Sequence, residues 1–441
     1  MNKLPPQVCT ALRMLGTNGY EAYIVGGCVR DSLLGRIPSD YDITTNALPD
    51  QTQKVFEHFK CIDIGKAHGT IAVLINGMQI EITTYRIDGE YKDKRHPESV
   101  RFTPRLRDDL SRRDFTINAL AYNESFGLAD FFGGREDLEK KLIRCVGEPA
   151  MRFEEDALRI MRAVRFASQL GFGIEDNTKK SILALKNTLS IISAERLRTE
   201  LEKLINGPFA FDILMSYHSV LCVFIPELTA LEHFDQHSKY HRYDVWEHTV
   251  RAVCSAPYNR LARITMLFHD VAKPLCFTLD SSGSGHFRDH PEKGAQVAQK
   301  ILRRLKYDNA TTDSVCLLIR YHDHRFKNKA DIKRILRIMG EELFFTLLVV
   351  QQADADAKDG QCTNPINNLS NVKKTAESVI SNGECYRICD MEINGTDIKN
   401  LGAEGPEIGK TLNMLLEQII NEKIENKKEV LISAASELIS R

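Results

Sequence analysis

The stretch GGCVRDSLLGRIPSDYDITT, residues 26–45, decides the fold of the N-terminal part of this protein. It follows a short apolar segment, EAYIV, and its two glycines lead into a short helix and then a strand. Side chains two residues apart in a strand share one face, so Asp40 and Asp42 should project together while Tyr41 points away. Two close carboxylates repel each other unless a cation lies between them, and Mg²⁺ prefers oxygen ligands. The stretch therefore predicts a metal site on a strand.

A β-hairpin is predicted in GTIAVLINGMQIEITTYR, residues 69–86, with its turn at Asn76-Gly77. Glu81 stands between isoleucines, so its side chain should point out of the core and add a third acid to the pair. The glycines at 26 and 27 let the backbone approach a phosphate at the helix start, with Arg30 beside it. By spacing alone, however, an Asp-X-Asp pair is more often two solvated acids than a metal site.

The composition is typical of a soluble enzyme with several domains. At 441 residues, the chain exceeds what one hydrophobic core usually serves. No stretch is apolar enough to span a bilayer, and two prolines interrupt the N-terminus where a signal peptide would be apolar. The 11 cysteines are scattered singly along the chain, which is not typical of a secreted disulfide scaffold. The formal net charge of −1 argues against binding of nucleic acid by overall charge, so any nucleic-acid site must be a local basic groove. We expect a cytoplasmic protein with no membrane segment, and the oligomeric state stays open.

The predicted fold class is α+β. Residues 1–145 mix strand and helix patterns and should form a mixed β-sheet with helices. From residue 146 onward helical periodicity dominates, for example in FEEDALRIMRAVRFASQLGF and SAERLRTELEKLI, so the remainder should be nearly all helical. Gly, Ser and Asn residues at 280–286 and 360–370 indicate loops.

Four motifs occur in a specific order: GGCVRD with DYDITT, then IEITTYR, then RRDFTINALAYN, then EDALRIMRAVRF. In this order they resemble the class II tRNA nucleotidyltransferases, the CCA-adding enzymes. The resemblance implies a catalytic head at residues 1–145, a helical neck for base recognition at 146–210, a helical body at 211–385 and a tRNA-binding tail at 386–441. It also implies template-independent addition of C, C and A to the 3′ end of tRNA from CTP and ATP, with release of pyrophosphate.

The same resemblance implies roles for residues of the head. Asp40 and Asp42 would hold catalytic Mg²⁺, with Glu81 as the third carboxylate, while the tRNA 3′-hydroxyl attacks the α-phosphate. The implied nucleotide contacts are Gly27, Arg30, Arg113 at the triphosphate and Asp114 at the ribose, with Asn118 in support. On charge alone Arg112 and Arg113 are a solvated pair, and the motif argues against that interpretation more strongly for Arg113 than for Arg112.

In the neck, Asp156 and Arg159 are three residues apart and are predicted to be neighbours on one helical face, which continues to Arg162 and Arg165. The resemblance implies that Asp156 and Arg159 read the Watson-Crick edge of the base and that Arg162 and Arg165 contact phosphate or nucleotide. Without the family, an intrahelical ion pair worth about 0.3 to 0.5 kcal/mol is the better interpretation.

Between these motifs lies RIDGEYKDKRHPESVRF, residues 86–102, whose composition is that of a mobile loop. The resemblance makes this segment the element that switches from C to A addition. Its family positions are Asp88, Tyr91, Asp93, Arg95, His96 and Pro97. Their presence favours full CCA synthesis over addition of two cytidines only.

Histidines and aspartates recur on the helices of the body, and they resemble the metal ligands of HD phosphohydrolases. The ligands for a second divalent metal would be His248, His269, Asp270 and Asp354. His290 and His322 would lie at the phosphate or at a second ion. A single helical histidine is more often packed or exposed than metal-bound, so occupancy stays open.

The tail, INGTDIKNLGAEGPEIGKTLNMLLEQIINEKI, resembles the tRNA-contacting end of the family, with Lys410 near a helix start. An ordinary helix-loop-helix is the alternative. Two other functions stay open. One is a bacterial-type poly(A) polymerase, and the other is a phosphohydrolase with an N-terminal unit that only binds nucleotide or tRNA.

Overall fold

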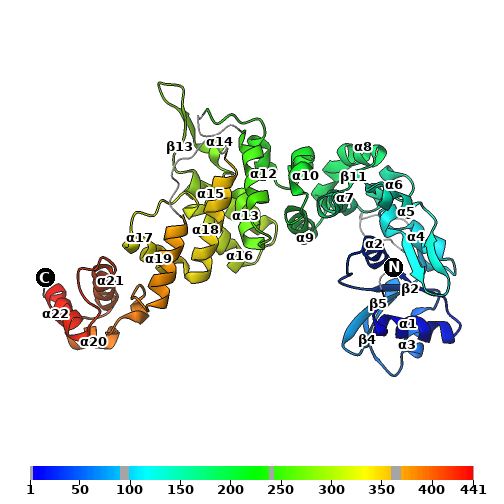
Figure 1. Ribbon diagram of the computed structural model, residues 1–441, viewed down its shortest axis with the longest axis horizontal. Coiled ribbons are helices and arrows are strands. Elements are labelled where there is room, and N and C mark those ends of the chain that lie inside the picture. The colour runs from blue at the N-terminus through cyan, green and yellow to red at the C-terminus, as the bar shows by residue number, and fades with distance from the viewer. Residues whose placement is uncertain (1–2, 90–98, 238–242, 359–368, 441) are drawn as a thin grey trace. The chain divides into compact units, whose positions relative to one another are not determined.

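The structure is a computed structural model that describes residues 3–89, 99–237, 243–358 and 369–440. The chain forms two compact units, residues 1–226 and 227–441, whose elements are labelled in Figure 1. The N-terminal unit combines a β-sheet with helices, and the C-terminal unit is almost entirely helical. The predicted α+β class is confirmed. The finer division into head, neck, body and tail stays a prediction.

A seven-stranded mixed sheet forms the centre of the N-terminal unit. Strands β2 and β5 run parallel, and the other neighbouring pairs are antiparallel. The strands in spatial order are β3 (Lys60–Gly65), β4 (Thr70–Ile75), β5 (Met78–Thr84), β2 (Asp42–Thr45), β1 (Ala22–Val25), β8 (Leu120–Asn123) and β9 (Gly127–Asp130).

The predicted hairpin is confirmed. Ile75 pairs with Met78, so β4 and β5 are joined by Asn76 and Gly77 alone. Both turn residues have positive φ, 45° and 82°, as the hairpin turns that match strand twist require.

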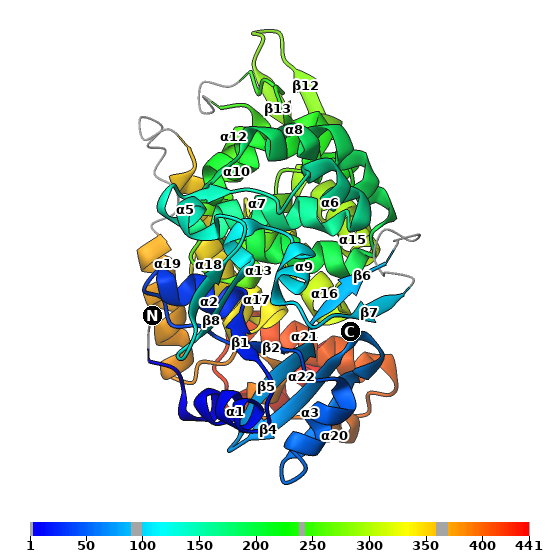
Figure 2. The same ribbon diagram turned by 90° about the vertical axis from the view of Figure 1, so that its right-hand side faces the viewer.

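Short helices surround the sheet and bury its apolar side chains. Helices α1 (Pro6–Thr17) and α3 (Pro49–Val55) pack against strands, and Figure 2 shows them beside β4 and β5. Val8, Leu12 and Leu15 recur at helical spacing on the buried side of α1. The remaining helices of the head are α2 (Gly27–Leu33), α4 (Leu106–Ser111) and α5 (Gly134–Glu139).

The helices that follow the head are α6 (Pro149–Glu155), α7 (Leu158–Leu170), α8 (Asp176–Leu185), α9 (Ala194–Ile205), α10 (Ala210–Ser216) and α11 (His218–Leu221). Helices α7 and α9 pack side by side. Two short strand pairings involve the part that was predicted to be nearly all helical. These are β10 (Leu142–Ile143) with β11 (Gly173–Ile174), and β12 (Phe277–Leu279) with β13 (Gly285–Phe287). Strands this short carry too little periodicity to be read from sequence.

Among the described residues of the C-terminal unit, one hydrophobic core lies among α16 to α19 and a second lies among the elements after Cys385. Its helices are α12 (Val245–Ser255), α13 (Arg260–Phe268), α14 (Lys273–Cys276), α15 (His290–Arg304), α16 (Asn309–Tyr321), α17 (Lys329–Met339), α18 (Glu341–Asp356), α19 (Leu369–Ser381), α20 (Gly395–Asn400), α21 (Pro406–Ile420) and α22 (Lys428–Ile439). Across the described segments, no helix combines the length and apolarity needed to cross a membrane.

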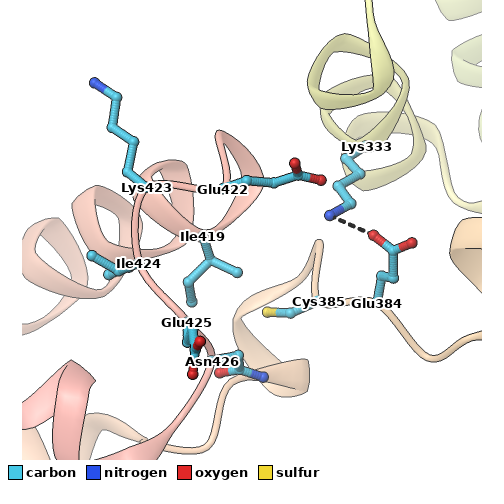
Figure 3. A pocket seen from close by; sticks show the side chains of 9 residues that line it. All are labelled: Lys333, Glu384, Cys385, Ile419, Glu422, Lys423, Ile424, Glu425 and Asn426. Carbon is cyan, nitrogen blue, oxygen red and sulfur yellow. Dashed lines mark ion pairs between the residues drawn. The ribbon is translucent and has the colours of Figure 1, made fainter.

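A pocket of about 340 Å³ lies where the second of these cores meets α17. Figure 3 shows Lys333 pointing toward Glu384, and Lys423 pointing away from both. The Lys333 Nζ lies 2.8 Å from Glu384 Oε2, and Lys333 is buried. A buried lysine is costly unless it is paired, so this ion pair holds α17 against the segment after α19.

Candidate active site

Three carboxylates converge on the exposed face of β2 and β5. Asp42 begins β2 and stands directly opposite Glu81 in the parallel pairing. Asp40, Asp42 and Glu81 are exposed, while Tyr41 and Ile43 between them are buried. The alternation of exposed and buried positions therefore places the three acids on one face, as predicted.

The extent of the strand differs from the prediction. SDYDITT was expected to be extended throughout, but β2 begins at Asp42, and Asp40 lies in the segment before it. The Ser39 hydroxyl donates to Asp40 Oδ1 at 3.0 Å. The prediction that both aspartates lie within a strand is wrong for Asp40, because no strand partner reaches that position. The alternation of exposed and buried side chains nevertheless extends from β2 back to Asp40.

The charges of this face act on Asp42. Although the residue is exposed, protein packed around its carboxylate raises its pKa, and so do the charges of Asp40 and Glu81, against the opposing effect of Arg113. The resulting pKa is about 6. A bound divalent cation would relieve the unfavourable effect of Asp40 and Glu81 on the ionised form of Asp42. The donor set, all carboxylate oxygen, suits a hard ion of the Mg²⁺ type.

This shift predicts a pH-dependent stability effect. Because the folded state raises the pKa of Asp42 from 3.8 to about 6, ionisation of Asp42 costs stability, and the cost grows as the pH rises through that interval. In EDTA, Asp42→Asn should raise the melting temperature at about pH 7.5 and leave it unchanged at about pH 3.5. Glu57→Gln, at an exposed carboxylate of the same unit, is the matched control. A stabilisation that is equal at both pH values would contradict the assignment.

The glycine turn brings the backbone close to Arg113. Gly26 has φ 79°, and a Cβ at this position would lie 2.9 Å from Arg113 Nη1. Gly27 begins α2, as predicted. Only glycine therefore permits both the conformation and the close approach of the guanidinium.

Four polar residues link α2 to the neck. Arg30 donates from Nη1 to Asn118 Oδ1 at 2.7 Å, and Asn118 donates to Asp114 Oδ1 at 3.0 Å. Arg162 donates from Nε and Nη2 to Asp114 Oδ2 at 2.8 and 2.6 Å. Burial alone would raise the pKa of Asp114, but Arg162 and Asn118 outweigh it and lower this pKa to about 2. Asp114 is thus held ionised and aligned, and its role at the ribose stays a prediction.

The helix predicted to carry the base-reading pair is interrupted. Helix α6 ends at Glu155 and α7 begins at Leu158, so Asp156 lies in the break with φ −139°. The prediction that Asp156 and Arg159 are neighbours on one helical face is therefore wrong. Asp156 Oδ1 accepts from the Leu158 amide, and its Oδ2 accepts from Arg196 Nη2 at 2.8 Å.

Arg159 and Arg165 occupy separate surroundings. Arg159 donates to Glu155 Oε2 at 2.6 Å and to the Arg112 carbonyl at 2.8 Å. Arg165 donates to Glu200 Oε2 at 2.8 Å and lies 3.5 Å from the centroid of the Phe166 ring. The neck arginines are thus oriented by named partners, so they are preorganised rather than solvated.

Sequence reasoning missed several of these partners. Asp109 is fully buried and accepts from Thr44 Oγ1 at 3.1 Å and from Arg112 Nε at 2.9 Å. The solvated pair that charge alone suggests for Arg112 and Arg113 is not found at Arg112, because its side chain is 18% exposed and paired with Asp109. The DDLSRR spacing, with acid and arginine three apart on a helix, was the available signal. Arg196 and Glu200 gave no comparable local signal, since their partners Asp156 and Arg165 are 40 and 35 residues away in the sequence.

The loop positions Tyr91, Asp93, Arg95, His96 and Pro97 lie outside the described residues. Asp88 ends the short strand β6 (Arg86–Asp88), which pairs with β7 (Val100–Phe102).

A second cluster lies in the C-terminal unit and contains the predicted body residues. His248, His269 and Asp354 each place a ligand atom within 4.8 Å of the others, and so do Asp270, His290 and His322. His248 Nε2 is 3.2 Å from His269 Nε2 and 3.0 Å from Asp354 Oδ1. Helices α12, α13, α15, α16 and α18 or their ends supply these six side chains.

The histidine rings are oriented by the backbone. His269, His290 and His322 each place Nδ1 within 2.7 to 2.8 Å of the carbonyl three residues earlier. A carbonyl can only accept, so Nδ1 carries the hydrogen and Nε2 faces the cluster. This is the arrangement that orients metal-binding histidines in proteins.

Electrostatics in the cluster keep several groups in the metal-binding form. Burial lowers the pKa of His322 to about 3 and lowers that of His248, so both imidazoles are neutral. Burial raises the pKa of Asp270, but His269 and Lys273 outweigh it and hold this carboxylate ionised. His269 differs, because Asp270 and Asp354 raise its pKa to about 9 against the effect of burial. An ion would have to displace that proton.

Family comparisons agree with the head and its site. Residues 22–144 match the "Poly A polymerase head domain", residues 171–231 match the "RNA and SrmB- binding site of polymerase A", and residues 292–435 match "tRNA nucleotidyltransferase domain 2". The head fold with its three acids thus defines a nucleotidyltransferase.

Full-length similarity specifies the family. A CCA-adding enzyme of Geobacillus kaustophilus is 35% identical over 433 residues, which cover 96% of this chain and 95% of that protein. A CCA-adding enzyme of Geobacillus thermodenitrificans is 54% identical over 212 residues, a match that covers 48% of this chain and about half, 52%, of that relative. The crystal structure of the Bacillus stearothermophilus CCA-adding enzyme in complex with CTP aligns with a TM-score of 0.74 at 28% identity, covering 99% of this chain and 98% of that one. This chain belongs to the CCA-adding enzyme family, which implies dependence on a divalent metal.

Proposed function

We propose that this protein adds C, C and A to the 3′ end of tRNA, without a nucleic-acid template, from CTP and ATP. The single observation that carries the proposal is the face shared by Asp40, Asp42 and Glu81, in a chain that matches CCA-adding enzymes along nearly its whole length. The full-length match to a CCA-adding enzyme favours this function over a bacterial-type poly(A) polymerase, which would share the head and neck motifs. We place the enzyme in the cytoplasm, in keeping with the free thiols of all cysteines in the described parts.

The residues of the head have distinct tasks in this reaction. Asp40, Asp42 and Glu81 would hold Mg²⁺, which supplies charge neutralisation at the α-phosphate and favours the deprotonated 3′-hydroxyl. Gly27 and Arg30 bind the nucleotide phosphates at the start of α2, and Arg113 contacts the triphosphate. Asp114 contacts the ribose while Arg162 and Asn118 hold its carboxylate in place.

Base selection falls to Asp156 and Arg159 in the neck. Arg196 orients the Asp156 carboxylate, while Glu155 and the Arg112 carbonyl orient the Arg159 guanidinium. A carboxylate and a guanidinium together display acceptors and donors, which is what discrimination between the edges of C and A requires. Arg162 and Arg165 contribute nucleotide or phosphate contacts, and the tail with Lys410 contacts tRNA by shape.

Arg159→Ile should weaken the discrimination between CTP and ATP before it abolishes turnover. Removing the donors of Arg159 should cut discrimination between CTP and ATP by about tenfold or more, because a lost charge-assisted hydrogen bond changes relative affinity on that scale. The measurement is single-nucleotide addition to tRNA lacking its 3′ end, with CTP and ATP supplied separately. Arg198→Ile, at an arginine on α9, is the matched control. Unchanged selection in Arg159→Ile would remove this residue from the recognition role.

A direct assay tests the proposed function. The protein is incubated with Mg²⁺ and tRNA lacking its 3′ end, and with CTP and ATP singly and together. Three added nucleotides ending in A support the proposal, whereas a long A tract indicates a poly(A) polymerase. No extension contradicts both.

A second candidate function rests on the body cluster. We propose that His248, His269, Asp270 and Asp354 bind a divalent metal and that the site hydrolyses phosphoesters, with His290 and His322 at a second ion or at the phosphate. The supporting observation is six buried or half-buried ligand side chains whose ligand atoms form two groups. A bound ion would activate water for attack on phosphorus. Lys273 Nζ, 2.7 Å from Asp270 Oδ2, helps keep that carboxylate ionised.

A further inference from the structure

A phenylalanine ring lies among three arginines of the proposed nucleotide site. Phe166 is on α7 and is buried, with 5% of its surface exposed. Its ring centroid lies 3.5 Å from the Arg165 Cζ, 4.9 Å from the Arg30 Cζ and 5.4 Å from the Arg162 Cζ. All three distances fall within the range of about 6 Å over which a cation is attracted to the face of an aromatic ring. The ring thus contacts one arginine of α2 and two of α7.

Each of the three guanidiniums also donates to an acceptor of its own. The pairs are Arg30 Nη1 with Asn118 Oδ1 at 2.7 Å, Arg162 Nη2 with Asp114 Oδ2 at 2.6 Å, and Arg165 Nε with Glu200 Oε2 at 2.8 Å. These acceptors fix the direction of each guanidinium separately. The Phe166 ring is a contact that all three share, so it fixes their positions relative to one another.

Three positive charges around one ring oppose one another. Burial lowers the pKa of Arg165 against the opposing effect of Glu200, and the charge of Arg162 lowers it further. An aliphatic side chain could fill a similar volume, but it has no negative face to offset this repulsion. The aromatic residue therefore supplies an attraction that packing alone does not.

A second aromatic ring fixes the orientation of Phe166. The ring of Phe115 is fully buried, and its centroid lies 5.9 Å from that of Phe166 at an interplanar angle of 85°. Aromatic pairs favour this edge-to-face arrangement. Phe115 directly follows Asp114, whose carboxylate accepts from Arg162. The two rings thus join the segment that carries Asp114 to the helix that carries Arg162 and Arg165.

We propose that Phe166 is a positioning residue that holds Arg30, Arg162 and Arg165 in the arrangement that binds the sugar and phosphates of the incoming nucleotide. This inference rests on the proposed function and deepens it. The proposed base-reading pair in the neck is oriented by partners outside this cluster. Phe166 should therefore serve CTP and ATP equally, without a part in the choice between them.

The test measures single-turnover extension by the full-length protein over a range of nucleotide concentrations. CTP is added to tRNA lacking its 3′ end, and ATP is added to tRNA ending in CC. Phe166→Leu removes the aromatic face, while Phe166→pentafluorophenylalanine keeps the ring and removes the negative potential of its face. In each variant the apparent Kd of both nucleotides should rise by about tenfold. The maximal rate should change by less than about threefold, because the carboxylates of the proposed metal site are intact.

Phe172→Leu, at a phenylalanine of the same unit that is also 5% exposed, is the matched control and should bind both nucleotides like wild type. A rise in apparent Kd for one nucleotide only, an unchanged apparent Kd in the fluorinated variant, or an equal rise in Phe172→Leu would each overturn the positioning role. If wild-type protein extends neither tRNA, the proposed function fails. Calorimetric titration with CTP and Mg²⁺ then tests the positioning role alone, and equal binding by wild type and the fluorinated variant would overturn it.

Discussion

Asp42→Ala should abolish nucleotide addition. Asp42 stands opposite Glu81 on neighbouring strands and shares its face with Asp40, so its loss removes carboxylate oxygens from the proposed metal site. Charge stabilisation by a catalytic metal is worth several kcal/mol, so the rate of C addition should fall on the order of 10³-fold or more. The measurement is single-turnover extension of end-labelled tRNA at saturating CTP.

Two controls show whether Asp42→Ala loses catalysis itself or loses tRNA binding or folding. Affinity for tRNA should change by less than about threefold, since an exposed aspartate on this face makes no contribution to distant phosphate contacts. Glu57→Gln should extend tRNA at the wild-type rate. Substantial addition by Asp42→Ala would exclude Asp42 as a metal ligand.

Asp270→Asn should abolish tight metal binding by the body cluster. Asp270 Oδ2 lies 3.2 Å from His269 Nε2 and 3.4 Å from His248 Nε2, while its Oδ1 lies 3.5 Å from His290 Nε2. The carboxylate thus faces both groups of candidate ligands, and its Oδ2 also forms an ion pair with Lys273 Nζ at 2.7 Å. An amide keeps the shape but loses the charge, so affinity should fall on the order of 100-fold or more.

Calorimetric titration with Mn²⁺ and Ni²⁺, together with thermal unfolding, measures this effect. An ion present at about 100 times its Kd stabilises a protein by about 2.7 kcal/mol, so wild-type protein should melt at a higher temperature with the ion than without it. Asp270→Asn should show no such rise. Asp323→Asn, at an exposed aspartate beside His322, should bind like wild type. Equal titration curves for wild type and Asp270→Asn would contradict the metal site, and hydrolysis of bis(p-nitrophenyl) phosphate by the variant would contradict its catalytic role.

Much of the head could be predicted because its signals are local. The Asn76-Gly77 turn sets the register of β4 and β5, and a period of two then places Glu81 on the exposed face. The predicted residues of the body also lie together. For example, His248 contacts Asp354, although 106 positions separate them in the sequence. Their residue types indicated the site, whereas the grouping into two sets of three came only from the packing of α12 to α18.

The error at Asp156 has a tertiary cause. A periodic pattern predicted a continuous helix through Asp156, but the structure breaks it there, where Arg196 from α9 pairs with the carboxylate. A partner distant in sequence thus outweighed a local preference of a fraction of a kcal/mol. Arg112 differs, because its partner Asp109 is only three residues away.

The sequence by itself determined the α+β class, the hairpin, the order of the motifs and the exposed face that carries three acids, because each depends on backbone periodicity over a few residues. Only the tertiary structure decided where β2 begins, which groups hold Asp156 and Arg159, and how six histidine and aspartate side chains meet in the C-terminal unit. Burial and long-range pairing set the energies of charged side chains, and neither quantity exists until distant segments have packed together.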